Sequence, residues 1–174
     1  MNKSCLLLCL SAVLMLTACR STSSYMYKGT DMRTIARASI ALGIDIDEDD
    51  DWPLLLESSS WLGTPYAYGG NTRSGVDCSA LTKIIYSNVY GVTLHRRSID
   101  QYAIDSARKV SKRKLRMGDL VFFTTDSSGR VSHTGIYLKN DRFIHASSSR
   151  GVIVSTLSDS YYSRHWISGG RIKK

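Results

Sequence analysis

The sequence has little that could cross a membrane. The apolar run near its start, residues 5–16, is about a dozen residues long, whereas a membrane-spanning helix needs roughly 20. With Lys3 in front of it, this run is typical of the core of a signal peptide. The chain of 174 residues is long enough for one domain with a hydrophobic core and too short for two large domains.

Cysteine is also scarce, with four in the chain. The apolar run ends in Leu-Thr-Ala-Cys at residues 16–19, which resembles a bacterial lipobox, where the cysteine is lipidated and becomes the first mature residue. We expect a signal peptide at residues 1–18, a lipidated tether and N-terminal segment at 19–51, and a folded domain at 52–174. A lipid on Cys19 would anchor the protein to a membrane of the cell envelope, facing the periplasm. A plain secretory signal with a chance cysteine is the alternative.

This processing leaves Cys78 as the only free thiol, because Cys5 and Cys9 leave with the signal peptide and Cys19 carries the lipid. Exported thiols normally form disulfides or have a chemical function. Cys78 is therefore a candidate reactive cysteine, and the alternative is a buried, inert thiol.

Acidic residues are few beside the basic ones, and the formal net charge is +8. Residues 108–116 form a dense basic stretch. Inside a cell such a stretch would suggest nucleic acid. Behind a lipobox the available polyanions are the cell wall and anionic lipid headgroups, so we expect no nucleic-acid partner. A solvated face is the alternative.

The hydrophobic pattern predicts an α+β domain with helices first and an antiparallel sheet second. A short helix is expected at 31–42, with Ile35, Ala38, Ala41 and Leu42 on one stripe, followed by an acidic linker up to residue 51. Further helices are expected at 52–62, 77–90 and 99–107. Strands are expected at 120–123, 131–138, 142–146, 151–154 and 165–172, with a hairpin turn at Asn140-Asp141.

Cys78 lies where a glycine-rich loop becomes a helix, with Asp77 as the expected N-cap. A thiol in the first turn of a helix is near the positive end of the helix dipole and near unpaired backbone N–H groups. Both favour the thiolate, so a pKa below that of a free thiol is expected. The same N–H groups can stabilise an oxyanion.

A cysteine nucleophile needs an imidazole partner and a group that orients it. His133 and His145 lie in two expected strands that are joined by a short turn. Their rings share a face only in one strand register, which the sequence leaves open. Spacing also does not decide which histidine is the base. His95 and His165 are interpreted as ordinary surface or interface histidines.

Five sequence blocks occur in one order: residues 63–70, 75–79, 117–123, 132–137 and 143–146. Together they resemble the NlpC-type bacterial cell-wall cysteine peptidases, and among these the small lipoprotein murein endopeptidases. The resemblance runs from about residue 62 to 172 and implies a papain-like fold. It departs from the family pattern at Leu94-His95-Arg96, where members often have Leu-Pro-Arg.

The resemblance also implies roles for single residues. It makes Cys78 the nucleophile, His133 the base and His145 the orienting residue. It places Tyr66 near the oxyanion, and Asp77 and Ser79 at the amino end of the substrate. The implied activity is hydrolysis of a peptidoglycan stem peptide or crosslink through an acyl-enzyme. The bond would join γ-D-glutamate or D-alanine to a diamino acid, and no cofactor or metal is implied.

Three other interpretations are compatible with the same residues. The first is an acyltransferase or lipid-acting thiol enzyme on the same fold. The second is a zinc site formed by Cys78, His133 and His145, a ligand set that catalytic zinc accepts. The third is a non-catalytic wall-binding module. The sequence leaves the cleaved bond, the membrane leaflet, the oligomeric state and the regulators open.

Overall fold

The computed structural model describes residues 31–126 and 128–173. The predicted signal peptide and Cys19 lie outside these residues. Within the described residues no helix is long and apolar enough to cross a membrane. The elements, in chain order, are α1 Met32–Leu42, α2 Trp52–Trp61, β1 Asn71–Thr72, β2 Gly75–Val76, α3 Cys78–Tyr90, α4 Ser98–Asp100, the π-helical turn Gln101–Asp105, β3 Ser106–Val110, the 3-10 turn Lys112–Lys114, β4 Leu120–Phe123, β5 His133–Tyr137, β6 Arg142–Ser147, β7 Gly151–Thr156, α5 Ser160–His165 and β8 Trp166–Ile172.

The first three helices begin at aspartate caps, of which the sequence predicts Asp51 and Asp77. Asp31, Asp51 and Asp77 each accept a hydrogen bond from a backbone N–H in the first turn of α1, α2 and α3, which satisfies a donor that has no partner within the helix. Gly91 ends α3 in the left-handed conformation, as expected. One detail differs, because Ala41 is exposed and does not join the buried stripe of α1.

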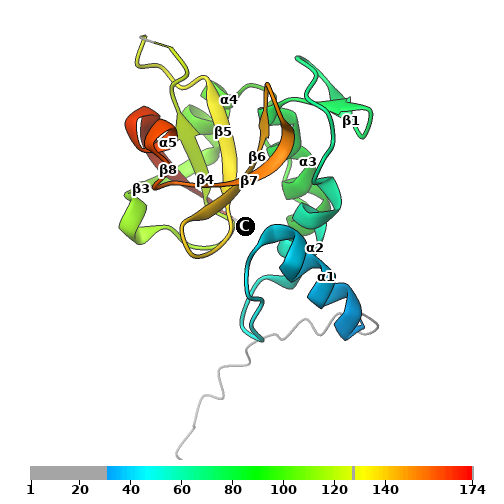
Figure 1. The fold of residues 1–174 in the computed structure, drawn as a ribbon. Coiled ribbons are helices and arrows are strands. Elements are labelled where there is room, and N and C mark those ends of the chain that lie inside the picture. The colour runs from blue at the N-terminus through cyan, green and yellow to red at the C-terminus, as the bar shows by residue number, and fades with distance from the viewer. Residues whose placement is uncertain (1–30, 127, 174) are drawn as a thin grey trace, which may run out of the picture.

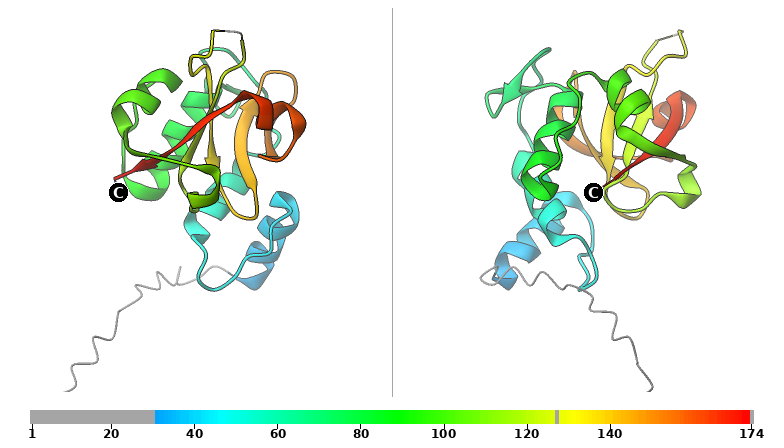
Figure 2. Two further views of the ribbon diagram at one scale, coloured as in Figure 1. Left: turned by 90° about the vertical axis from the view of Figure 1, so that its left-hand side faces the viewer. Right: turned by 180° about the vertical axis from the view of Figure 1, so that it is seen from behind.

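Six antiparallel strands form the main sheet in the order β3-β8-β4-β5-β6-β7. Asn140 and Asp141, between β5 and β6, both have positive φ values of 51° and 67°. This geometry is typical of a tight hairpin turn and confirms the predicted turn. Figures 1 and 2 show the sheet between α2 and α3 on one side and α5 on the other. The α+β fold is therefore confirmed.

Each face of the sheet has its own hydrophobic cluster. On the face toward α3, residues such as Leu81, Phe122 and Ile144 form the larger cluster. On the opposite face a smaller cluster is built from Val121, Phe123, Phe143, Leu157 and Tyr162. Side chains along a strand alternate between faces, so β4, β5 and β6 supply residues to both clusters.

Three features differ from the predicted elements. The third predicted helix is a short α-helical turn followed by a π-helical turn that ends at Asp105, and the next residues form the edge strand β3. The side chains of β3 are charged and largely exposed, as is common for edge strands, so the sequence shows no hydrophobic alternation that would predict this strand. His165 belongs to α5 rather than to the last strand, and a helix of six residues is too short to show a periodic pattern.

The segment expected to be an acidic linker packs against the domain. Ile44 in this segment is 2% exposed and belongs to the larger cluster, as does Leu42 at the end of α1, which is 1% exposed. Lys139, next to the β5–β6 turn, forms ion pairs with Asp47 and Asp50. The burial of the two apolar side chains and these ion pairs hold the segment in place, so it is not a free linker.

Candidate active site

Cys78 is the first residue of α3 and is 9% exposed. The backbone N–H groups of Thr134, Ser79 and Cys78 itself interact with the thiol and favour the thiolate. Burial has the larger effect and raises the pKa of Cys78 to about 11, because a charged sulfur loses its hydration in an apolar site. The expectation of a pKa below that of a free thiol is therefore wrong for the unliganded site.

His133 and His145 are brought together on one face of the sheet. Nε2 of His133 and Nδ1 of His145 are 2.9 Å apart, within hydrogen-bonding distance, and the two rings meet edge to face. His133 begins β5, directly before Thr134, whose N–H interacts with the Cys78 thiol. Because His145 takes Nε2 of His133, Nδ1 is the ring nitrogen of His133 left for another partner.

The register between β5 and β6 explains this meeting. Ile136 pairs with Ile144 and Tyr137 with Phe143, a register that places Gly135 opposite His145. A Cβ atom at Gly135 would lie 2.6 Å from the carbonyl oxygen of Ile144 and 3.1 Å from Cβ of His145. The absence of a side chain at Gly135 thus leaves room for the ring of His145 beside His133.

Both imidazoles are neutral at pH 7. Burial lowers the pKa of His133 to about 4. Burial, followed by the nearby His133, holds the pKa of His145 well below its usual value. Each ring therefore carries one proton, and each has one nitrogen that can accept a hydrogen bond.

Two hydroxyl groups lie behind His145, and the sequence alone did not reveal either. Ser155 Oγ of β7 and the Tyr162 hydroxyl of α5 are each 3.1 Å from Nε2 of His145. Tyr162 comes from a helix that the sequence pattern did not predict. Ser155 gave no signal because its approach depends on the pairing of β6 with β7.

Asp77 and Ser79, which are buried, form a cluster with the partly exposed Arg96, which sequence reasoning also missed. Arg96 donates to both carboxylate oxygens of Asp77, at 2.9 and 2.5 Å, and to Ser79 Oγ at 2.9 Å. Burial alone would raise the pKa of Asp77, but the hydrogen bonds from Arg96 and from the N–H groups of Ala80 and Gly69 hold it below the usual value. Asp77 thus both caps α3 and orients Arg96. The Leu-His-Arg block was the sequence signal that could have identified Arg96.

Hydrogen bonds fix the Leu94-His95-Arg96 loop, which departs from the family pattern. His95, in place of the proline, contacts Asp105 through Nδ1 at 2.7 Å, and its carbonyl oxygen accepts a hydrogen bond from Gln101 at 2.9 Å. Gln101 is fully buried and also donates to the carbonyl oxygen of Ser79. These contacts replace the rigidity of a proline and set the position of Arg96. His165 lies away from this cluster, with Nδ1 against the carbonyl oxygen of Tyr161.

Tyr66 lies beside the thiol and the carboxylate. It forms an isolated parallel bridge with Val76, two residues before Cys78. Burial, then the proximity of Cys78 and Asp77, raises the pKa of Tyr66. Its hydroxyl therefore stays protonated at neutral pH and is able to donate a hydrogen bond.

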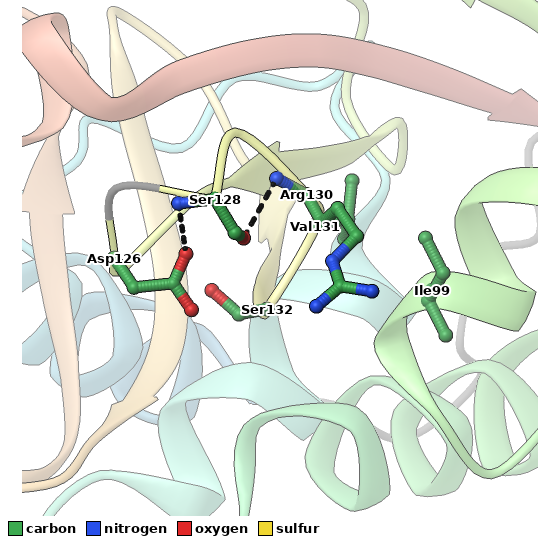
Figure 3. Close-up of a pocket in the computed structure, with 6 residues that line it drawn as sticks. All are labelled: Ile99, Asp126, Ser128, Arg130, Val131 and Ser132. Carbon is green, nitrogen blue, oxygen red and sulfur yellow. Dashed lines mark hydrogen bonds between the residues drawn. The ribbon is translucent and has the colours of Figure 1, made fainter.

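A pocket is lined by the segment that leads into β5. Ser132, the residue before His133, contributes to its wall. Figure 3 shows the carboxylate of Asp126 and the guanidinium of Arg130 at this pocket, with Ile99 on the far side. The lining therefore combines both charges with an apolar side chain, and it is continuous in sequence with the start of β5.

A cysteine at the start of a helix and paired histidines on an antiparallel sheet form the arrangement expected of an NlpC-type cysteine peptidase. The comparison with known families agrees with this class. The sequence profile of the NlpC/P60 family matches residues 63–171, which is more than half of the chain. The chain therefore belongs to the NlpC/P60 family.

Individual relatives match to different extents. A probable endopeptidase NlpC homolog of Haemophilus influenzae is 39% identical over 114 residues, 66% of this chain and 58% of that protein. The murein DD-endopeptidase MepS/murein LD-carboxypeptidase of Escherichia coli K12 is 29% identical over 171 residues, 94% of this chain and 89% of that protein. A solved NLP/P60-family structure from Staphylococcus aureus has a TM-score of 0.63 at 32% identity, covering 75% of this chain and 43% of that one.

Proposed function

We propose that this chain is a cysteine peptidase that hydrolyses peptide bonds of peptidoglycan, with Cys78 as nucleophile, His133 as base and His145 as orienting residue. The observation that supports it best is the 2.9 Å contact between His133 Nε2 and His145 Nδ1, beside a cysteine in the first turn of a helix. The murein endopeptidase named among the relatives supports peptidoglycan as the substrate class. The bond cleaved is a γ-D-glutamyl–diamino-acid or a D-Ala–diamino-acid bond.

The proton moves during attack rather than before it. Cys78 and His133 are both neutral at pH 7, since burial raises the pKa of the first and lowers that of the second. The thiol therefore gives its proton to Nδ1 of His133 as sulfur bonds to the substrate carbonyl carbon. The imidazolium then protonates the leaving amine. In the second half, His133 takes a proton from the water that attacks the acyl-enzyme, the C–S bond breaks, and the proton returns to the sulfur of Cys78.

The start of α3 supplies the groups that stabilise the negative oxygen of the intermediate. Asp77 accepts from the N–H of Ala80, so the cap leaves the N–H groups of Cys78 and Ser79 directed to the thiol region. Donors fixed in a buried site stabilise developing charge strongly. Tyr66, with its protonated hydroxyl near Cys78, is the side-chain donor in this proposal.

The substrate's amino end is assigned to the cluster of Asp77, Ser79 and Arg96. Both carboxylate oxygens of Asp77 are already engaged by Arg96 and by backbone N–H groups. The carboxylate supplies negative charge close to the substrate, while the side chain of Arg96, 40% exposed, faces solvent. The proposal is thus that Asp77 acts together with Arg96 rather than as an isolated acceptor.

The alternatives make different demands on the same residues. For zinc, His133 Nε2 and His145 Nδ1 would have to point at a common ion, yet they point at each other. Among the described residues, no group of three His, Cys, Asp or Glu side chains is placed to hold a metal ion. An acyltransferase would use the same acyl-enzyme with another acceptor, and a wall-binding module would bind without cleaving.

Digestion of purified peptidoglycan, with mass analysis of the fragments, tests the proposal. Wild-type protein should release fragments cut at one type of stem-peptide or crosslink bond. Cys78→Ala should release none while keeping its fold, and His165→Gln, a histidine change away from the site, should match wild type. Full activity in Cys78→Ala would overturn the proposal. Products joined to an added amine rather than to water would favour the acyltransferase.

A further inference from the structure

The histidine pair works only in one arrangement of protons. If His133 Nδ1 is to accept the thiol proton, the proton of neutral His133 must be on Nε2. It then donates to His145, whose Nδ1 must be the acceptor. Neutral His145 must therefore carry its own proton on Nε2. In the opposite tautomer, Nδ1 of His145 would donate to His133 and leave His133 without a free lone pair for Cys78.

Something must hold the proton of His145 on Nε2, because His145 is only 1% exposed and water does not surround it. Ser155 Oγ and the Tyr162 hydroxyl oxygen are its neighbours there, each at 3.1 Å. A buried N–H without an acceptor is destabilising. An acceptor at this place therefore decides the tautomer.

We propose that Ser155 and Tyr162 are positioning residues whose hydroxyl oxygens accept the Nε2 proton of His145 and so keep His133 in its basic form. This inference rests on the proposed function and adds residues to its mechanism. Neither hydroxyl touches the substrate in the proposal, and both act through His145.

The surroundings of Tyr162 favour its role as an acceptor. The positive charge of Arg150 lies near enough to act on the Tyr162 hydroxyl, whose pKa burial raises overall. A guanidinium has only donors, so toward Arg150 the Tyr162 oxygen can only be an acceptor. The positive charge of Arg150 also disfavours a second proton on His145, which would block Nδ1 as an acceptor.

The fold holds these two hydroxyl groups rigidly. Phe143 pairs with Ser155, and His145 with Ile153, across β6 and β7. Ser155 is thus the diagonal neighbour of His145 on the same face. Tyr162 is 7% exposed, and its ring packs edge to face against Phe143 and Phe123. A phenylalanine at position 162 keeps these ring contacts and removes only the oxygen.

Four variants test the proposal: Tyr162→Phe, Ser155→Ala, the double variant, and Tyr162→Phe combined with Ser155→Thr as the conservative control. Each single variant leaves one acceptor and should lose less than about tenfold in kcat on a defined soluble stem peptide. The double variant should lose roughly 10²-fold or more, with KM nearly unchanged, because His133 loses its basic tautomer. Ser155→Thr in the Tyr162→Phe background should restore most of that loss.

A variant that needs no tautomer control distinguishes a role in fixing the tautomer of His145 from a role in packing alone. In His145→Asn the amide oxygen accepts from His133 without any tautomer, so adding both hydroxyl deletions should change kcat little. Nitrogen chemical shifts of the labelled imidazoles should show His145 protonated on Nε2 in wild type and on Nδ1 in the double variant. Full kcat and an unchanged tautomer in the folded double variant would overturn the inference. Failure of the proposed function would show differently, as Cys78-independent activity.

Discussion

At the scale of single residues, His133 and His145 have unequal roles, although spacing alone made them interchangeable. His133→Ala should be nearly inactive, because removal of a base costs roughly 10²–10⁴-fold in the proton transfer. His145→Gln and His145→Asn should keep measurable activity and exceed His145→Ala, since an amide oxygen can still accept from His133 Nε2. Kinetics on a defined stem peptide measure this. If His145→Gln is as inactive as Cys78→Ala while His133→Gln is active, the roles are reversed.

The pH dependence follows from the same two rings. Burial lowers the pKa of His133 to about 4 and that of His145 well below its usual value. The proposed base must be neutral, and a lowered pKa keeps it neutral to lower pH. We expect kcat/KM to stay constant from neutral pH down to about pH 5 and to fall only at lower pH. The midpoints belong to the histidine pair and not to either ring alone. A profile recorded while circular dichroism monitors folding tests this, and an acid midpoint at 6.5 or above contradicts it.

Because Gly135 has no side chain, the His145 ring has room beside His133. In Gly135→Ala the new Cβ would meet the Ile144 carbonyl oxygen at 2.6 Å and Cβ of His145 at 3.1 Å, so β6 and the ring must move. We expect kcat to fall roughly tenfold or more, because small displacements of catalytic groups are costly. Gly169→Ala in β8 is the control, since its Cβ would crowd the side chains of Leu115 and Val110 at 2.6 Å and the Val110 carbonyl oxygen at 3.0 Å instead of the histidine pair. Equal kcat losses in both variants would mean that the effect is a general disturbance of the sheet.

At the scale of elements, the start of α3 depends on Asp77. Asp77→Ala removes the cap and leaves Arg96 without its carboxylate partner. Loss of a cap alone costs about 0.5–2 kcal/mol of stability. We expect Asp77→Ala to lower the free energy of unfolding more than Asp31→Ala does, because Asp31 is the exposed cap of α1. Asp77→Asn should keep the cap but weaken the ion pair. Urea unfolding and kcat/KM measure both effects, and equal destabilisation by the two alanine variants would contradict the expectation.

At the scale of the whole molecule, the lipid anchor is the main expectation that lies outside the described residues. The mature protein should partition into detergent and carry fatty acid on Cys19. Cys19→Ala should lose the lipid but cleave a soluble stem peptide at the wild-type rate, because the proposed site lies wholly in residues 66–162. Mass analysis of the protein extracted from membranes tests this. An unmodified Cys19 in that material would show that the lipobox interpretation is wrong.

Much of the architecture could be read from local patterns. Aspartate caps, the glycine at the end of α3 and the Asn-Asp hairpin turn are local in sequence, so the helix starts and the β5–β6 hairpin were predicted near their observed positions. The charged edge strand β3 and the short helix α5 were missed, although Asp159 caps α5. An exposed edge strand and a helix of six residues leave no periodic pattern from which to predict them.

The sequence by itself determined that Cys78 begins a helix and that two histidines lie in neighbouring strands. Only the tertiary structure decided the register that puts both rings on one face, with 2.9 Å between their nitrogens. It also decided the burial that raises the pKa of Cys78, against the expectation from the helix terminus, and the approach of Ser155 and Tyr162 to His145. The physical reason is that caps and turns are made by neighbours along the chain, whereas register, desolvation and hydrogen-bond partners arise from segments that meet only after folding.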